Sequence, residues 1–190
     1  MLVALCLIVA GQSQSAQQVY DRIQDKLRHT HTIRLDVLST NGDSWDKYSF
    51  ISMRKPNMAC AFDGWGERYE FDGKTIRERV DGKARKRIPA EGEPRAVPTY
   101  WQYFMQGFES FSAPQAKVEC IGSARDLGPN QDRIAIAIRI EGQPPCTLYV
   151  SKRTGLPVGF GDSERMRYAY ETVRLDCPVD NADFSRSIEP

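Results

Sequence analysis

Residues 48–88 read YSFISMRKPNMACAFDGWGERYEFDGKTIRERVDGKARKRI, and apolar or aromatic residues recur at every second position along much of this stretch. A period of two is typical of strands that bury one face. Two Asp-Gly pairs, at 72–73 and 81–82, favour two-residue hairpin turns, because the central residues of such turns need positive φ. We therefore predict a β-meander with strands at residues 48–53, 58–62, 67–71, 75–80 and 84–88.

A predicted helix lies on either side of this meander. In residues 15–29, Val19, Ile23 and Leu27 are spaced four apart between charged residues, which indicates an amphipathic helix. In residues 99–111, TYWQYFMQGFESF, the apolar positions also follow helical spacing, and there are more aromatic residues than a surface helix needs. Such a helix belongs either to an ordinary core or to the lining of a ligand cavity, and the sequence leaves both alternatives open.

The strand pattern occurs in the rest of the chain as well. It predicts strands at 33–38, 116–121, 133–140, 146–150, 165–175 and 183–188, and a short one that ends near residue 160. In RIAIAIRI, residues 133–140, both alternating sets are apolar, so we expect this strand to be covered on both faces. The predicted fold class is mainly β (α+β). We expect a single curved antiparallel sheet, or incomplete β-barrel, of about eleven strands with two or three helices covering its concave side.

The N-terminal residues predict export. Residues 1–10, MLVALCLIVA, are uninterruptedly apolar, are too short to span a bilayer of about 20 helical residues, and precede a small polar stretch. We interpret residues 1–16 as a signal peptide and residues 17–190 as a single domain. The expected location is the periplasm or another extracytoplasmic compartment.

The overall charge indicates which partners to expect. The chain has 26 basic and 25 acidic residues, a formal net charge of +1, so no global field attracts nucleic acid or an anionic membrane. We expect no nucleic-acid partner. Basic residues cluster locally in residues 77–87, and we interpret them as a solvated strand edge.

Removal of the signal peptide would leave four cysteines: Cys60, Cys120, Cys146 and Cys177. An even number in an exported chain makes all four disulfide candidates, and buried thiols are the alternative. Neither a C-x-x-C pair nor a histidine near a cysteine is present in the sequence, so we predict no metal site and no cofactor. The sequence also lacks G-x-S-x-G, a phosphate-binding loop and H-E-x-x-H, so we predict no catalytic residues and no enzymatic activity.

Three motifs in order resemble the LolA-like superfamily of outer-membrane lipoprotein carriers. They are SFISMRKPNM at 49–58, FDGKTI at 71–76 and LYVSKRTGLPVGF at 148–160. The resemblance implies an incomplete β-barrel with a helical lid over an apolar cavity. The carrier has Arg before the Pro and an aromatic residue soon after it, whereas this chain has Lys55, preceded by Arg54, and Ala59. Arg54 and Lys55 are therefore candidates for a lid latch, and the chain resembles a divergent member rather than the carrier itself.

The resemblance implies a monomeric binding protein that holds lipid or lipoprotein acyl chains in this cavity. The alternatives are an envelope-stress sensor that binds a membrane-anchored partner, and a purely structural extracytoplasmic domain. The predicted ligand-binding residues are Ile51, Met53, Trp101, Phe104, Met105, Phe108, Ile136 and Ile138.

Overall fold

The computed structural model describes residues 14–40, 45–53, 58–63, 68–72, 74–80, 82–88, 117–162 and 166–179. Within these ranges the helix α1 (Ala16–His29) precedes eleven strands. The strands are β1 (Thr32–Thr40), β2 (Trp45–Met53), β3 (Met58–Asp63), β4 (Arg68–Phe71), β5 (Ile76–Val80), β6 (Lys83–Arg87), β7 (Val118–Asp126), β8 (Arg133–Ile140), β9 (Cys146–Ser151), β10 (Pro157–Gly161) and β11 (Met166–Leu175).

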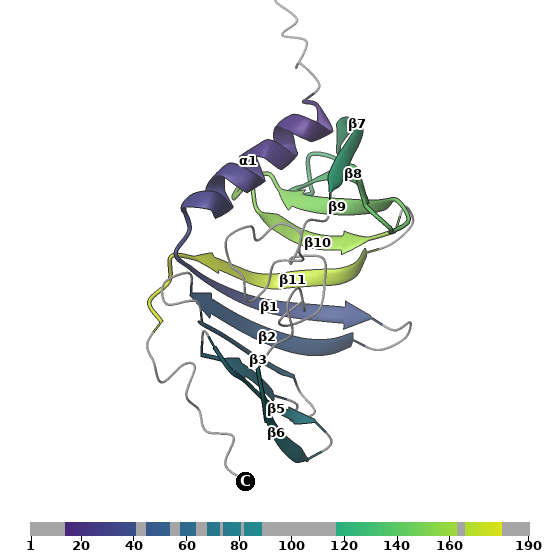
Figure 1. The fold of residues 1–190 in the computed structure, drawn as a ribbon. Coiled ribbons are helices and arrows are strands. Elements are labelled where there is room, and N and C mark those ends of the chain that lie inside the picture. The colour runs from purple at the N-terminus through teal and green to yellow at the C-terminus, as the bar shows by residue number, and fades with distance from the viewer. Residues whose placement is uncertain are drawn as a thin grey trace, which may run out of the picture.

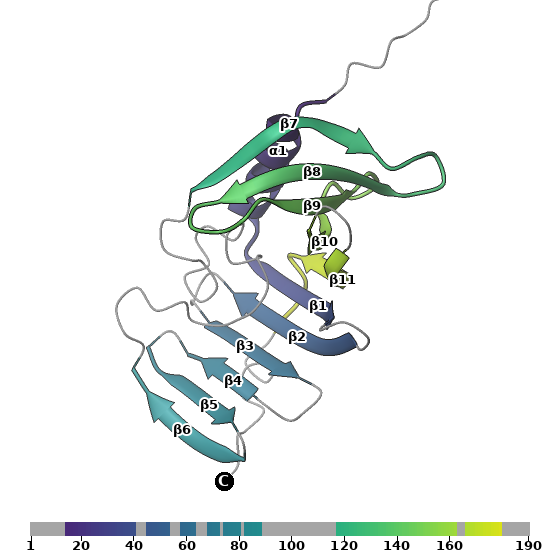
Figure 2. The ribbon, with the colours of Figure 1, turned by 90° about the vertical axis from the view of Figure 1, so that its right-hand side faces the viewer.

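These strands form a single sheet in the order β6-β5-β4-β3-β2-β1-β11-β10-β9-β8-β7. Every neighbouring pair is antiparallel. The sheet is twisted and curved, and it is open, with β6 at one edge and β7 at the other (Figures 1 and 2). The prediction of a mainly β fold built on an open antiparallel sheet is confirmed. The helix predicted at 99–111 and the strand predicted at 183–188 lie outside the described residues.

Helix α1 begins at a capping box. The Ser15 side chain accepts a hydrogen bond from the Gln18 backbone, and the Gln18 side chain accepts one from the Ser15 backbone. Ala124 of β7 donates its N–H to the Gln14 carbonyl at 2.9 Å, so the folded unit includes residues before the predicted domain start at 17. The buried residues of α1 are Ala16, Val19, Tyr20, Ile23 and Leu27, and they pack on β7 and β8 (Figure 1). In the described part of the chain, no helix has both the length and the apolar character that crossing a membrane requires.

The turns of the meander differ in length. Val80 pairs with Lys83, which leaves the two-residue loop predicted at 81–82. Phe71 pairs with Ile76, so four residues separate β4 from β5, and the prediction of a two-residue turn at 72–73 is wrong. The Asp72 carboxylate explains the longer loop, because its Oδ1 accepts hydrogen bonds from the backbone of residues 74 and 75 at 3.0 and 2.8 Å.

Two further expectations about the C-terminal half are corrected. Strand β7 continues to Asp126, past the predicted end at 121, because a bulge with Gly122 at φ 69° lets the strand bend and pair again with β8. Strand β8 is covered on one face and partly open on the other: Ile136 and Ile138 are buried, whereas on the opposite face Ala135 is 5% exposed and Ala137 is exposed. The expectation that both faces are covered therefore holds at Ala135 and is wrong at Ala137.

Candidate functional site: the apolar face of the sheet

One face of the sheet is apolar across most of its width. Val37 of β1 lies opposite Tyr170 of β11, and Phe160 of β10 lies opposite Leu148 of β9, which in turn lies opposite Ile136 of β8. Residues directly opposite in an antiparallel pair share a face. We call this surface the apolar face. Its buried members form one hydrophobic cluster, and Tyr69 and Val173 are partly buried and pack against it. The buried members are Ile33, Leu35, Val37, Phe71, Ile76, Ile136, Ile138, Ile140, Leu148, Val150, Phe160 and Tyr170.

The opposite face of the sheet is more polar, although it also includes Ile121, Ala135 and Ala137. On β1 the alternate residues are Arg34, which lies opposite Arg174 of β11, and Asp36, whose carboxylate accepts a hydrogen bond of 2.6 Å from the Ser49 hydroxyl. On the β7–β8 pair, Arg139 binds Glu119 at 3.0 Å, and both side chains are about half exposed. The sheet is therefore amphipathic, and only the apolar face needs a cover.

Helix α1 covers one end of the apolar face. Most of its contacts are with β7 and β8, so its buried side chains pack on the end that carries Ile136 and Ile138. At 1.5 Å per residue a 14-residue helix is about 21 Å long and about 10 Å wide, whereas eleven strands at about 4.8 Å spacing extend over roughly 48 Å. Phe71 and Ile76, on β4 and β5, are 1% and 0% exposed and belong to the end of the sheet away from α1.

The predicted ligand-binding residues occupy different places. Ile136 and Ile138 are fully buried, in the cluster that includes the α1 side chains. The register pairs Ile51 with Arg34 and Met53 with Thr32, and it pairs residue 50, not residue 51, with Leu35 of the apolar face. Ile51 and Met53 are thus in register with the face opposite the apolar one. The side chains of Ile51 and Met53 are not among those described, and Arg54, Lys55, Trp101, Phe104, Met105 and Phe108 lie outside the described residues.

Sequence reasoning missed several members of the apolar face. Leu35, Val37, Phe71, Ile76 and Phe160 were not among the predicted ligand-binding residues, although each is at most 2% exposed. Their signal was present, because each occupies an alternate position in a predicted strand. A single sheet was predicted, but the strand order was not, and it decides which strands are neighbours of β4, β5, β9 and β10.

The disulfide prediction is wrong for the described cysteines: Cys120, Cys146 and Cys177 are free. Cys120 and Cys146 both lie opposite Ile138, one from β7 and one from β9. Two strand spacings, about 9–10 Å, separate them, beyond the roughly 7 Å between Cα atoms that a disulfide tolerates. The side chain of Cys60 is not described.

Both thiols beside Ile138 are held protonated by their surroundings. Burial raises the pKa of Cys120 to about 11, with a smaller contribution from the charge of Asp21. Burial raises the pKa of Cys146 to about 12, and its Sγ donates to the Ile138 carbonyl at 3.4 Å. Since the thiolate is the nucleophile, these cysteines are packing residues rather than reactive groups.

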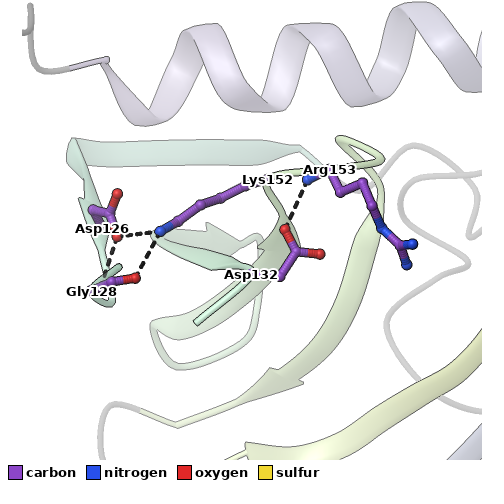
Figure 3. Close-up of polar contacts among 5 residues, drawn as sticks. All are labelled: Asp126, Gly128, Asp132, Lys152 and Arg153. Atoms are coloured by element: carbon purple, nitrogen blue, oxygen red, sulfur yellow. Dashed lines mark hydrogen bonds and ion pairs between the residues drawn. The ribbon is translucent and has the colours of Figure 1, made fainter. Parts of the chain in front are cut away.

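A polar cluster fastens the turn of the Thr-Gly-Leu-Pro motif, at the end of the sheet near α1. Lys152 Nζ lies 2.6 Å from Asp126 Oδ1 and donates to the Gly128 carbonyl at 2.9 Å, while Asp132 accepts from the Arg153 backbone N–H at 2.9 Å (Figure 3). These bonds join the β7–β8 loop to the β9–β10 turn. Figure 3 shows the Arg153 side chain pointing away from the cluster.

The same turn is joined to α1 and to the sheet. Lys26 of α1 donates to the Thr154 carbonyl. Asp132 Oδ2 accepts from the Ser151 hydroxyl at 2.7 Å, and Gly155 takes φ 64°, which suits glycine. The motif that carries part of the family resemblance is thus a structural turn.

The electrostatics of this cluster do not favour acid–base chemistry. The hydrogen bond from Lys152 holds the pKa of Asp126 below its usual range, and the hydrogen bond from Ser151 does the same for Asp132. Both carboxylates are therefore ionised acceptors near neutral pH. Among the described residues, no group of three His, Cys, Asp or Glu side chains could hold a metal ion.

No family model matches the chain, and no curated protein sequence matches it either. A conserved protein from Thermus thermophilus has a similar structure, with a TM-score of 0.54 and 13% identity over 92% of this chain and 94% of that one. A LolA superfamily protein from Nitrosomonas europaea has a TM-score of 0.38 and 10% identity over 90% of this chain and 98% of that one.

A chain of the Pseudomonas aeruginosa MucA/MucB complex has a TM-score of 0.41 and 13% identity over 90% of this chain, which spans only 61% of that longer chain. At these identities a likeness concerns the fold alone. The chain shares its fold with the Thermus protein over nearly the whole of both chains.

Proposed function

We propose that this chain is a divergent LolA-like binding protein, located outside the cytoplasm, that holds the acyl chains of a lipid or lipoprotein against the apolar face. The observation that carries the proposal is the extent of that face, which runs from Ile76 of β5 to Ile140 of β8. A helix the size of α1 covers two or three strands of it, and Phe71 and Ile76, on strands away from α1, are already 1% and 0% exposed, so an acyl chain would replace a cover that the face has in this structure.

The strand order supports the proposal. Strands β6 and β7 are consecutive in the sequence but form opposite edges, so the residues between Arg87 and Val118 connect one edge of the sheet to the other. That connection contains the sequence predicted to be an aromatic helix. We propose that Trp101, Phe104, Met105 and Phe108 contact the acyl chain from the side opposite the sheet.

The energetics favour a ligand with more than one acyl chain. Each buried methylene contributes about 0.8 kcal/mol, so ten contribute about 8 kcal/mol. Association itself costs roughly 4–15 kcal/mol. We expect a diacyl or triacyl compound to bind more tightly than a single fatty acid.

Uptake of a fluorescent long-chain acyl probe by the purified protein tests the proposal, with two neighbouring substitutions on β11. Val173 belongs to the apolar face and Thr172 to the polar one, and both are partly buried. We expect Val173→Asn to weaken probe binding, because it places an amide against the acyl chain. Thr172→Asn should leave binding unchanged. Equal effects of the two substitutions, or no uptake by the unsubstituted protein, would contradict the proposal.

The alternative function, a regulatory sensor with a membrane-anchored partner, stays a prediction. A partner that copurifies in place of lipid would favour it.

A further inference from the structure

Strand β6 is the last strand of the meander and forms one of the two edges of the sheet (Figure 2). In the described part of the structure β6 pairs only with β5, so its outer backbone N–H and C=O groups have no strand beside them. Four of its five residues are basic, and Lys83–Lys86 are exposed. The next residue along the chain, Ile88, is 82% exposed.

The positive charge on this edge is compensated only in part, by Glu78 and by Asp72, on which Lys86 acts electrostatically. The Glu78 carboxylate of β5 forms an ion pair with Arg87, whose Nε and Nη2 lie 3.3 and 3.4 Å from its two oxygens. Among the described residues, Lys83, Arg85 and Lys86 form no ion pair. Charged side chains also protect edge strands against aggregation, and four cations among five residues in addition make this edge complementary to an acidic segment.

The register distributes these charges over both sides of the strand. Lys83 and Arg85 lie opposite Val80 and Glu78, while Lys86 lies opposite Arg77 and thus on the other side. A flat anionic lipid surface would contact the cations on only one side of β6. An added strand would place its own side chains beside the cations on both sides. A second copy of β6 is disfavoured, because like charges would face each other.

We propose that β6 is a docking edge for an extended acidic segment of a partner protein, which adds to the sheet as a further strand. The backbone of β6 supplies the ladder hydrogen bonds and the three cations select the acidic side chains. This site is an edge of the sheet, with Lys83 and Arg85 on the same side as Ile76 of the apolar face and Lys86 on the other side, and the proposal does not depend on lipid binding.

The test uses a labelled eight-residue peptide that alternates Glu with Thr and Val, with binding to the full chain followed by fluorescence anisotropy. We expect saturable binding that weakens with salt. Arg85→Glu should weaken it on the order of tenfold, because a favourable exposed ion pair is replaced by a repulsive one. The matched control is Arg125→Glu, which makes the same charge change at an exposed position of the other edge strand, β7, and should leave affinity unchanged.

A peptide of the same sequence, N-methylated at alternate residues, separates strand addition from charge attraction. The methylated peptide keeps the charges but lacks the backbone N–H groups along one edge of the added strand, so we expect its binding to be lost. Equal binding of both peptides would overturn the proposal, as would equal weakening by the two substitutions, no peptide binding, or binding of anionic vesicles without binding of the peptide.

Discussion

Replacing Ile138 with Ala tests whether the end of the apolar face under α1 is packed protein or ligand space. Ile138 is 0% exposed and lies between Cys120 and Cys146 on the neighbouring strands. A substitution of this kind in a packed core costs about 2–5 kcal/mol, from lost burial and from the cavity left behind. Typical domains are stable by only about 5–15 kcal/mol.

For a chain of this length, each kcal/mol lowers the melting temperature by about 2–4 °C, so a loss of about 3 kcal/mol predicts a decrease of roughly 6–12 °C. The assay is thermal and urea unfolding followed by circular dichroism. Ala137→Ser is the matched control, because Ala137 is the exposed neighbour on the opposite face, and its effect should stay within about 0.5 kcal/mol. A loss for Ile138→Ala below about 1 kcal/mol would refute the packing and leave the residue free to contact a ligand.

Three further predictions follow from single contacts. Thiol labelling should find the three described cysteines free in denaturant, and it should find Cys120 and Cys146 slow to react in the folded protein at pH 8; no labelling in denaturant would contradict the free thiols. The pKa values of Asp126 and Asp132 are lowered by folding, so their contribution to stability is present above the unfolded pKa of about 3.9 and lost as the pH falls through the folded values. The double substitution to Asn should flatten this acid loss in unfolding titrations from pH 7 to 2, and an unchanged loss would contradict this. Gly159→Ala should destabilise the β10–β11 pair, because the new methyl group would lie 2.9 Å from the Tyr168 carbonyl oxygen; an unchanged urea midpoint would contradict this.

Local patterns predicted most of the described elements. The period of two in residues 48–88 and the period near four in residues 15–29 correspond to strands and to α1, because each element buries one face. Where the prediction failed, a local interaction determined the length of a turn or the end of a strand. The Asp72 carboxylate lengthened one turn, and the bulge at Gly122 carried β7 beyond its expected end.

The candidate site was harder to predict, because it depends on which strands become neighbours. Phe71 and Leu148 are 77 positions apart in the sequence (148 − 71), yet they belong to one cluster. The cysteine count likewise suggested bridges, whereas the strand order places Ile138 between two of the thiols. Composition cannot reveal that two cysteines lie on strands that are not neighbours, since this depends on how the strands pair in the sheet.

The most direct test of acyl-chain binding is mass spectrometry of the organic-solvent extract of protein purified without detergent. The apolar face predicts an acyl lipid in near-stoichiometric amount, and the Val173→Asn protein should carry less of it while Thr172→Asn carries as much as the unsubstituted protein. A folded protein whose extract contains no acyl compound, and which takes up none when one is offered, would contradict the proposed function.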